Sequence, residues 1–167
     1  MARLFVAAWP DEAVLAALDG LERPDDPSLR WVPRRQLHVT LRFLGDVAEN
    51  AIDEVSSALA RVDASSVVAS VGPRAGRLGR SIWCVPVEGL AATAAAVNDA
   101  TIAFGQSPDP RPFFGHITLA RMKGRPACGL DDRRVNVTWR VGVLHLVRSL
   151  TLPSGASYET LAEVELR

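Results

Sequence analysis

Two short phrases of the sequence carry the same residue types in the same order. LHVTLRFLG (37–45) contains His38 and Thr40, and GHITLARMK (115–123) contains His116 and Thr118; a leucine follows each threonine. The chain has 3 histidines, so two of the three stand in one repeated four-residue pattern. This repetition favours a shared chemical task over chance.

Two imidazoles and two hydroxyls are suited to acid–base chemistry at a phosphate. Histidine titrates near neutral pH, so one imidazole can act as a general base while the other acts as a general acid. Threonine hydroxyls can donate hydrogen bonds to phosphate oxygens without adding charge. No Asp or Glu shares the polar face of either phrase. The pattern therefore predicts hydrolysis of a phosphodiester without a metal or cofactor, with His38 and His116 catalytic and Thr40 and Thr118 binding phosphate.

Both phrases are typical of β-strands, which we predict at 37–44 and 114–121. Side chains alternate between the faces of a strand, so His38, Thr40 and Arg42 should face one way, with His and Thr about 6.5–7 Å apart. Arg42 is therefore another candidate for phosphate binding. The intervening residues, which should face the core, are Val39, Leu41 and Phe43. Arg121 has the opposite parity to His116 and reaches the same face only if the strand ends or twists after Ala120.

The two phrases belong to a longer repeat. A strand at 4–9, a helix at about 10–18 and a loop lead to the first phrase, and a strand at 82–87, a helix at 90–104 and a loop lead to the second. Leu4 precedes His38 by 34 positions, and Ile82 precedes His116 by the same number. With a helix at 49–61 and strands at 67–71, 139–152 and 158–166, the pattern predicts similar repeats at about 4–71 and 82–152. We expect an α+β fold of two lobes, antiparallel sheets with flanking helices related by a pseudo-two-fold axis, with the two His-Thr pairs on opposite sides of a central cleft.

Composition and charge limit the class of protein. The chain has 167 residues, 48% of them hydrophobic and 23% charged, which is typical of a single globular domain spanning 1–167. Its net charge is zero, so any polyanion must be bound by local patches. Cys84 and Cys128 form neither a metal-type spacing nor a disulfide framework, and the apolar run at 4–9 is too short for a signal peptide or a membrane span. We therefore expect a cytoplasmic monomer without membrane contact.

Other candidate residues have weaker patterns. His145 has no threonine partner and shares a strand face with two valines, so we expect it to be structural. Phe114 stands just before the second motif and could stack on a nucleobase, with Phe113 as the alternative. The segment GPRAGRLGR (72–80) carries three arginines that could grip phosphate or simply be solvated, namely Arg74, Arg77 and Arg80. Three tryptophans are expected in the core: Trp31, Trp83 and Trp139.

The paired phrases resemble the His-x-Thr motifs of the two-histidine phosphoesterase superfamily, in particular its RNA 2′,3′-cyclic phosphodiesterases, also called the 2′-5′ RNA ligase family. The likeness extends over RLFVAAWP, RWVPRRQLHVTLRFLG, SIWCVPV, GHITLAR and LVRSLTLPSGASYETL. It implies a bilobal α+β fold with a central cleft, and hydrolysis of terminal 2′,3′-cyclic phosphates on RNA to 2′-phosphates without metal. Some members also join RNA ends through 2′-5′ linkages. The resemblance further implies that Arg121 lies near the phosphate, that His116 activates water and that His38 protonates the departing 3′ oxygen.

The sequence departs from the family pattern at two places. Gly115 stands where members commonly carry proline before the second histidine, which should loosen the start of that strand. The stretch between Arg121 and Trp139, which contains MKGRPACG, is short, so a helix often expected there should be missing.

The expected partners are RNAs with 2′,3′-cyclic phosphate ends, for which tRNA halves are one candidate, or cyclic nucleotides. One alternative is a phosphoesterase for a small cyclic nucleotide such as ADP-ribose cyclic phosphate. A second is a non-catalytic module that binds RNA ends, which would not need two histidines. A third is a metallohydrolase, which the lack of carboxylates in both motifs disfavours.

Overall fold

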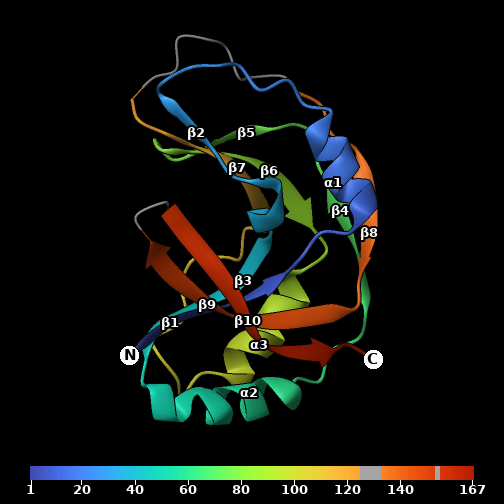
Figure 1. The fold of residues 1–167 in the computed structure, drawn as a ribbon. Helices are drawn as coiled ribbons and strands as arrows, with labels where there is room; N and C mark the ends of the chain where they lie inside the picture. Colours follow the sequence, from blue (N-terminus) through green and yellow to red (C-terminus); the bar gives the residue numbers. More distant parts are fainter. Residues whose placement is uncertain (125–132, 153–154) are drawn as a thin grey trace.

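In the described part of the chain, ten strands form one curled antiparallel sheet with three α-helices at its margins (Figure 1). The structure, a computed structural model, describes residues 1–124, 133–152 and 155–167. This architecture confirms the expected α+β class. Helix α1 packs near β8, whereas α2 and α3 lie at the other end of the molecule (Figure 1). None of the helices in these ranges is long and apolar enough to cross a membrane.

The elements follow the predicted order with two additions. The strands are β1 (Ala2–Ala8), β2 (Leu29–Trp31), β3 (Val39–Val47), β4 (Val67–Val71), β5 (Gly76–Leu78), β6 (Ile82–Glu88), β7 (His116–Met122), β8 (Val137–Val141), β9 (Val143–Leu152) and β10 (Gly155–Glu165). The helices are α1 (Glu12–Asp19), α2 (Ile52–Ala60) and α3 (Ala91–Ala100), with 3-10 turns η1 (Arg34–Gln36) and η2 (Glu49–Ala51). The short strands β2 and β5 were not predicted from the sequence, and each pairs with a neighbour that supplies its hydrogen bonds.

The sheet order is symmetric about the two motif strands. It runs β10-β9-β1-β3-β7-β6-β4-β8, so β3 and β7 occupy the middle. Strand β4, from the first half of the sequence, pairs with β6, and β9, from the second half, pairs with β1. The two halves of the chain therefore exchange strands across the molecule. The segment expected as one strand at 139–152 is divided at Gly142 into β8 and β9, which lie at opposite ends of this order.

A β-bulge interrupts both motif strands directly after the threonine. In β3, Thr40 pairs with Ala7 and Arg42 with Val6, which leaves Leu41 as the extra residue. In β7, Thr118 pairs with Cys84 and Ala120 with Trp83, which leaves Leu119 extra. An extra residue reverses the alternation of side chains beyond it. The two bulges thus change the faces of the two residues that follow, Arg42 and Phe43 in β3 and Ala120 and Arg121 in β7, and a second irregularity shifts the register of β3 again between Phe43 and Gly45.

Arg42 is the first residue affected, and its placement corrects the expectation from strict alternation. Its side chain is 3% exposed and points away from the face of His38. The guanidinium donates to the backbone carbonyls of Asn98 at 2.7 Å, Phe104 at 3.1 Å and Gln106 at 3.2 Å. These carbonyls lie at and beyond the C-terminal end of α3, where unpaired acceptors and the helix dipole favour a cation. Arg42 therefore caps α3 and is not available to a phosphate.

Phe43 is displaced in the opposite sense. Strict alternation placed it in the core, but beyond the bulge its ring faces the side of the sheet that carries His38 and lines the central cleft. Most of the other expected core residues are buried, with Trp83 at 0% and Trp139 at 4% exposure. Trp31 is only partly buried, because one side packs edge-to-face on Trp83 at 5.4 Å while another borders the cleft.

Gly115 does not loosen the start of β7. Its carbonyl accepts a hydrogen bond from the amide of Val87 at 2.7 Å, and the residue is buried. A Cβ at this position would collide with the Val87 carbonyl oxygen. Glycine is required here by the close approach of β6, which corrects the expectation of a loose strand start. Most of MKGRPACG, including Cys128, and the turn residues Pro153 and Ser154 lie outside the described residues.

Replacement of Arg42 by methionine tests its capping role. The change leaves three backbone carbonyls at the end of α3 without their charged donor, and we expect the free energy of unfolding to fall by about 2–4 kcal/mol. Urea denaturation followed by circular dichroism measures this difference. The matched control is Arg140→Met on β8, where an exposed arginine donates to the Ser66 hydroxyl at 3.1 Å and little stability should be lost. Equal effects of the two substitutions would contradict the capping role.

Candidate active site

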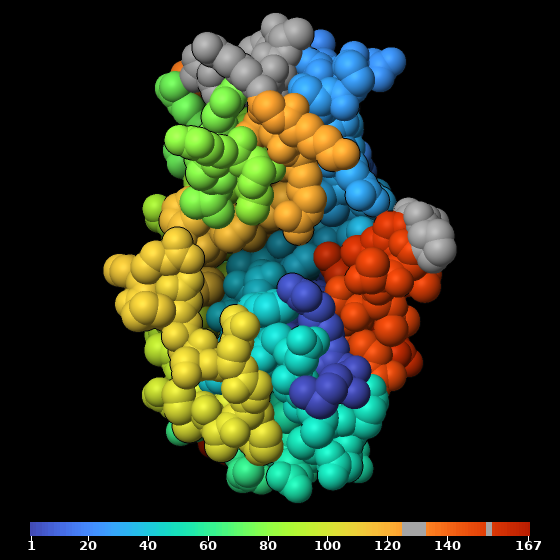
Figure 2. Space-filling model, turned by 90° about the vertical axis from the view of Figure 1, so that its left-hand side faces the viewer, coloured from blue at the N-terminus to red at the C-terminus, as the bar shows by residue number. Residues whose placement is uncertain are grey.

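A cleft of about 730 Å³ opens between the two ends of the sheet, with the motif strands at its floor. Figure 2 faces this hollow, in which teal residues of the β3 region are visible between orange β7 and the red hairpin of β9 and β10. Polar and charged lining residues are Arg3, Arg30, Arg35, Gln36, His38, Thr40, His116, Thr118, Arg121, Ser149, Ser157 and Tyr158. Among the described residues, no Asp or Glu lines it. Four arginines without a carboxylate make the cleft attractive to anions.

The two motifs meet at one backbone pair. Val39 of β3 pairs with Ile117 of β7 in antiparallel register, and both side chains are 0% exposed. Continued by one residue in each direction, this register sets His38 beside Thr118 and Thr40 beside His116, on the face opposite to the buried pair. Opposed Cβ atoms on antiparallel strands lie about 4.5–5.5 Å apart. The two His-Thr pairs therefore lie side by side at the floor of the cleft, rather than on opposing walls as expected.

Both imidazoles are held through Nδ1 by the same local contact. His38 Nδ1 lies 2.7 Å from the carbonyl oxygen of Gln36, and His116 Nδ1 lies 2.9 Å from that of Phe114. A carbonyl only accepts, so each Nδ1 carries the proton and Nε2 is the basic nitrogen of the neutral ring. His38 Nε2 lies 3.1 Å from the Thr40 hydroxyl, which can donate to it. Because Nδ1 of each ring is bound to a carbonyl, Nε2 is the nitrogen that remains available in the cleft.

The two histidines differ in their surroundings. Three aromatic rings surround His38, with ring centroids 5.1 Å away for Phe5, 5.3 Å for Trp9 and 5.4 Å for Tyr158. Burial among them lowers the pKa of His38, because the imidazolium loses water; the positive charges of His116 and Arg121 act in the same direction. His116 instead stacks on Phe114 at 5.6 Å, and that phenylalanine is 51% exposed. The repeated motif thus occupies an apolar setting on one side and an open one on the other.

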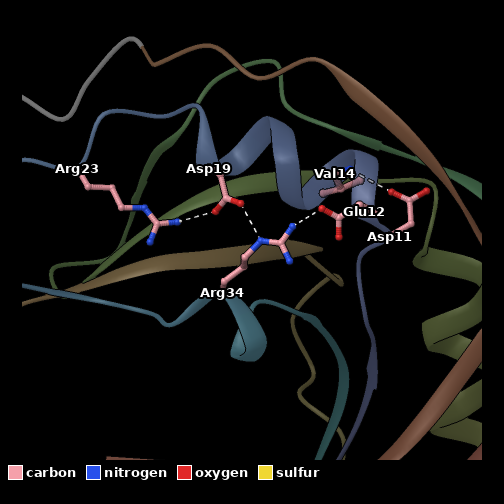
Figure 3. A network of polar contacts seen from close by, with 6 residues as sticks. All are labelled: Asp11, Glu12, Val14, Asp19, Arg23 and Arg34. Atoms are coloured by element: carbon pink, nitrogen blue, oxygen red, sulfur yellow. Dashed lines mark hydrogen bonds and ion pairs between the residues drawn. The ribbon is translucent and has the colours of Figure 1, made fainter.

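An ionic network supports the turn that precedes His38. Arg34 of η1 donates from Nε to Asp19 of α1 at 2.7 Å and from Nη2 to Glu12, as Figure 3 shows. Arg23 also donates to Asp19, at 3.5 Å. These groups are solvent-accessible, so each ion pair adds little stability by itself. Together they fix η1 to α1, and η1 supplies the Gln36 carbonyl that orients His38.

Arg121 reaches the cleft because of the bulge at Leu119. The bulge reverses its parity, so that it shares the cleft with His116 and Thr118. Its charge contributes to the lowered pKa of His38, which indicates that the guanidinium lies near the motif of the other strand. Three further arginines of the cleft were not singled out from the sequence: Arg3, Arg30 and Arg35. They stand in unrelated segments, and only the fold brings them together.

The remaining sequence candidates lie outside the set of cleft-lining residues. Phe114 is exposed at the rim beside His116, whereas Phe113 packs on the core. His145 makes an ion-pair contact of 3.6 Å with Glu163 and an edge contact with Trp9. None of the three arginines of segment 72–80 borders the cleft, and Arg77 lies in strand β5, opposite Trp83.

Metal-binding and thiol chemistry find no support in the described parts of the chain. Within them, no three or more His, Cys, Asp or Glu side chains are grouped as metal ligands would be. Cys84 is buried, which raises the pKa of its thiol to about 11 and keeps it protonated. The polar groups assembled at the cleft include two imidazoles, two threonine hydroxyls and four guanidiniums.

The sheet order and the paired motifs define a protein of the phosphoesterase class. The family model of LigT-like phosphoesterases matches residues 8–72. A Thermus thermophilus protein named RNA 2′,3′-cyclic phosphodiesterase is 32% identical over 99% of this chain and 90% of its own length. One of the same name from Aeropyrum pernix is 31% identical over 82% of this chain and 86% of its own. This chain belongs to the LigT-like phosphoesterase family.

Solved structures agree with this assignment. The crystal structure of the Thermus thermophilus protein TT0787 superposes with a TM-score of 0.86 at 28% identity, covering 99% of this chain and 98% of that one. Escherichia coli LigT complexed with 3′-AMP has a TM-score of 0.82 at 22% identity, with 99% and 98% of the two chains covered. The latter likeness shows the shared fold.

The apolar surroundings of His38 predict a measurable titration. We expect NMR titration of the imidazole resonances to give His38 a pKa below its ordinary value of 6.5, because its charged form is poorly hydrated. Tyr158→Ala opens one side of the aromatic enclosure and should move this pKa upward. A Tyr158→Phe variant keeps the ring and should leave it unchanged. A His38 that titrates above 6.5 in the unsubstituted protein would refute this account.

Proposed function

We propose that this protein hydrolyses the terminal 2′,3′-cyclic phosphate of RNA to a 2′-phosphate, with His38 and His116 as the acid–base pair and without a metal. The observation that carries the proposal is the pairing of the two His-x-Thr motifs on β3 and β7 at the floor of an arginine-lined cleft. The names of the two full-length relatives support the same reaction. Shared family and a shared constellation of groups point to one chemistry.

The reaction requires one proton to be removed and another to be delivered. A water oxygen attacks phosphorus and loses a proton to the base, while the bond from phosphorus to the 3′ oxygen breaks and that oxygen takes a proton from the acid. The product keeps the 2′ ester and gains a free 3′ hydroxyl. Two imidazoles on adjacent strands, each with its Nε2 toward the cleft, can perform the two transfers on one bound phosphate.

The threonines and Arg121 supply the electrostatic part of the mechanism. Negative charge accumulates on the non-bridging phosphate oxygens as water adds, and donors fixed in advance stabilise it. Thr40 and Thr118 flank the site as neutral donors, and Arg121 adds a full positive charge. Thr40 lies within hydrogen-bond distance of His38 in the free cleft, so it would turn its hydroxyl to the phosphate when substrate binds.

The environments of the two histidines favour an assignment opposite to that implied by the family resemblance. A general base must start neutral, and burial with a lowered pKa keeps His38 neutral at pH 7. His116 lies at the open side of the cleft, beside the exposed ring of Phe114. We therefore assign water activation to His38 and protonation of the 3′ oxygen to His116.

A small cyclic nucleotide such as ADP-ribose cyclic phosphate would be handled by the same groups, so substrate turnover must separate that alternative. The deciding experiment incubates the protein with an RNA ending in a 2′,3′-cyclic phosphate, in parallel with the small substrate, and identifies products by mass and by phosphatase sensitivity. Inclusion of EDTA tests the metal-free mechanism. Absence of a 2′-phosphate product, or activity lost in EDTA and restored by a divalent ion, would reject the proposal as stated.

Removal of either motif histidine should nearly abolish turnover. His38→Ala and His116→Ala are each expected to lower kcat by about 10²–10⁴-fold, the usual contribution of one acid–base group. His145→Ala is the matched control, because this third histidine lies outside the cleft-lining set, and its kcat should remain within about threefold of the unsubstituted protein. Steady-state rates on the cyclic-phosphate RNA give all three values. A loss in His145→Ala as large as in the other two would show that the acting residues are misassigned.

A substrate with a good leaving group in place of the 3′ oxygen distinguishes the acid from the base. Such a leaving group departs without protonation, so it should restore part of the rate to the variant that lacks the acid and none to the variant that lacks the base. Our assignment predicts recovery in His116→Ala only. Recovery in His38→Ala alone would reverse the roles, and recovery in neither variant would contradict the acid–base scheme.

A further inference from the structure

Two arginines stand directly opposite each other on neighbouring strands at one wall of the cleft. The antiparallel register of β2 and β7 pairs Arg30 with Arg121, and that of β6 and β7 pairs Ile82 with the same Arg121. All three residues line the cleft. Because directly opposed residues share one face of a sheet, Arg30 and Arg121 extend from the same surface, their Cβ atoms about 5 Å apart.

This placement is unfavourable for the folded protein alone. Like charges directly opposite on a sheet destabilise it. Among the described residues no carboxylate forms an ion pair with Arg30 or Arg121, although several other arginines, such as Arg34 and Arg148, have such partners. No carboxylate of those parts lines the cleft either. Two guanidiniums left uncompensated beside a reaction centre indicate an anionic ligand that spans both.

Arg30 and Arg121 differ in their position relative to the two motif strands. Arg121 lies on β7, the strand that carries His116 and Thr118, and lines the cleft with them. Arg30 is one strand farther out, and its Nη2 lies so close to Gly155 at the start of β10 that a Cβ there would collide with it. Gln36 Nε2 also reaches this hairpin, donating to the Ala156 carbonyl at 2.6 Å. Arg30 therefore occupies the passage between the reaction centre and the β9–β10 hairpin.

We propose that Arg30 binds the phosphate attached to the 5′ oxygen of the terminal ribose, while Arg121 binds the cyclic phosphate on the same sugar. This inference rests on the proposed function, because it takes a 2′,3′-cyclic nucleotide end as the ligand. One ribose separates the two phosphates, and two arginine side chains on adjacent strands are long enough to bind one phosphate each. The site then selects a polynucleotide end, or a 5′-phosphorylated nucleotide, over a cyclic nucleoside phosphate that has no 5′-phosphate.

The test compares two small substrates that differ in one group, adenosine 2′,3′-cyclic phosphate and its 5′-phosphorylated form. The unsubstituted protein should have the higher kcat/KM for the 5′-phosphorylated compound, by about 10- to 100-fold, as a charge-assisted hydrogen bond to phosphate allows. Arg30→Gln should abolish this preference, lowering kcat/KM for the 5′-phosphorylated compound far more than for the plain cyclic nucleotide. Arg30→Lys, which keeps the charge but loses the planar fork, should keep part of it. Arg140→Gln, on the exposed face of β8, is the matched control and should keep all of it.

Thermal unfolding supplies an independent measurement. Because Arg30→Gln removes a like-charge pair, its Tm without ligand should be unchanged or higher; a fall would indicate a structural role and contradict the proposal. Equal loss of kcat/KM on both substrates would mean that Arg30 grips the reacting phosphate, and an intact preference would mean that it grips neither; each result overturns the inference. Failure of the unsubstituted protein to hydrolyse cyclic-phosphate RNA and both compounds would instead reject the proposed function.

Discussion

The single backbone pair between Val39 and Ile117 is the constraint on which the site depends. It joins the two halves of the sheet at the middle residue of each His-x-Thr motif, and both side chains are fully buried. A slip of one residue in either strand would exchange the two faces, bringing the histidines into the core and the aliphatic residues into the cleft. The apolar residue between His and Thr in each motif therefore sets the register, and this register brings two imidazoles and two hydroxyls to the floor of the cleft.

The bulges after Thr40 and Thr118 are the second determinant of the site. At each of these bulges one extra residue reverses the side-chain alternation, so the residues that follow at equivalent positions of the two strands face the same side of the sheet despite their different types. Arg42 and Ala120 face inward, while Phe43 and Arg121 face the cleft. The two motif strands thus share a backbone geometry but differ in the side chains that follow the bulges. Strand β3 has the ring of Phe43 where β7 has the guanidinium of Arg121. Arg42 caps α3 and does not face the cleft.

The predictable part of the structure is the part encoded locally. Residue type and alternation are enough to identify the His-x-Thr phrases and most strand positions. They also predict the buried residues on either side of each threonine, and they place Cys84 in a strand. The bulges are not encoded in a recognisable pattern, and this is why the parity argument failed for Arg42 and was ambiguous for Arg121. The aromatic rings around His38 come from β1, from Trp9 directly after it and from the C-terminal hairpin, and Arg30 comes from a three-residue strand. Only tertiary pairing, including the exchange of β4 and β9 between the halves, brings them to the cleft.

A nearly symmetric site must still perform an asymmetric reaction. Hydrolysis needs one neutral and one protonated imidazole at the start, and two identical surroundings would give both rings the same affinity for protons. The strands that flank the motifs break this equivalence. Strand β1 and the C-terminal hairpin place Phe5, Trp9 and Tyr158 around His38, whereas His116 has only the exposed ring of Phe114 beside it among the described residues. In the proposed mechanism, burial stabilises the neutral form of His38, so the duplicated fold supplies the two histidines and the unequal flanking residues set the direction of proton transfer.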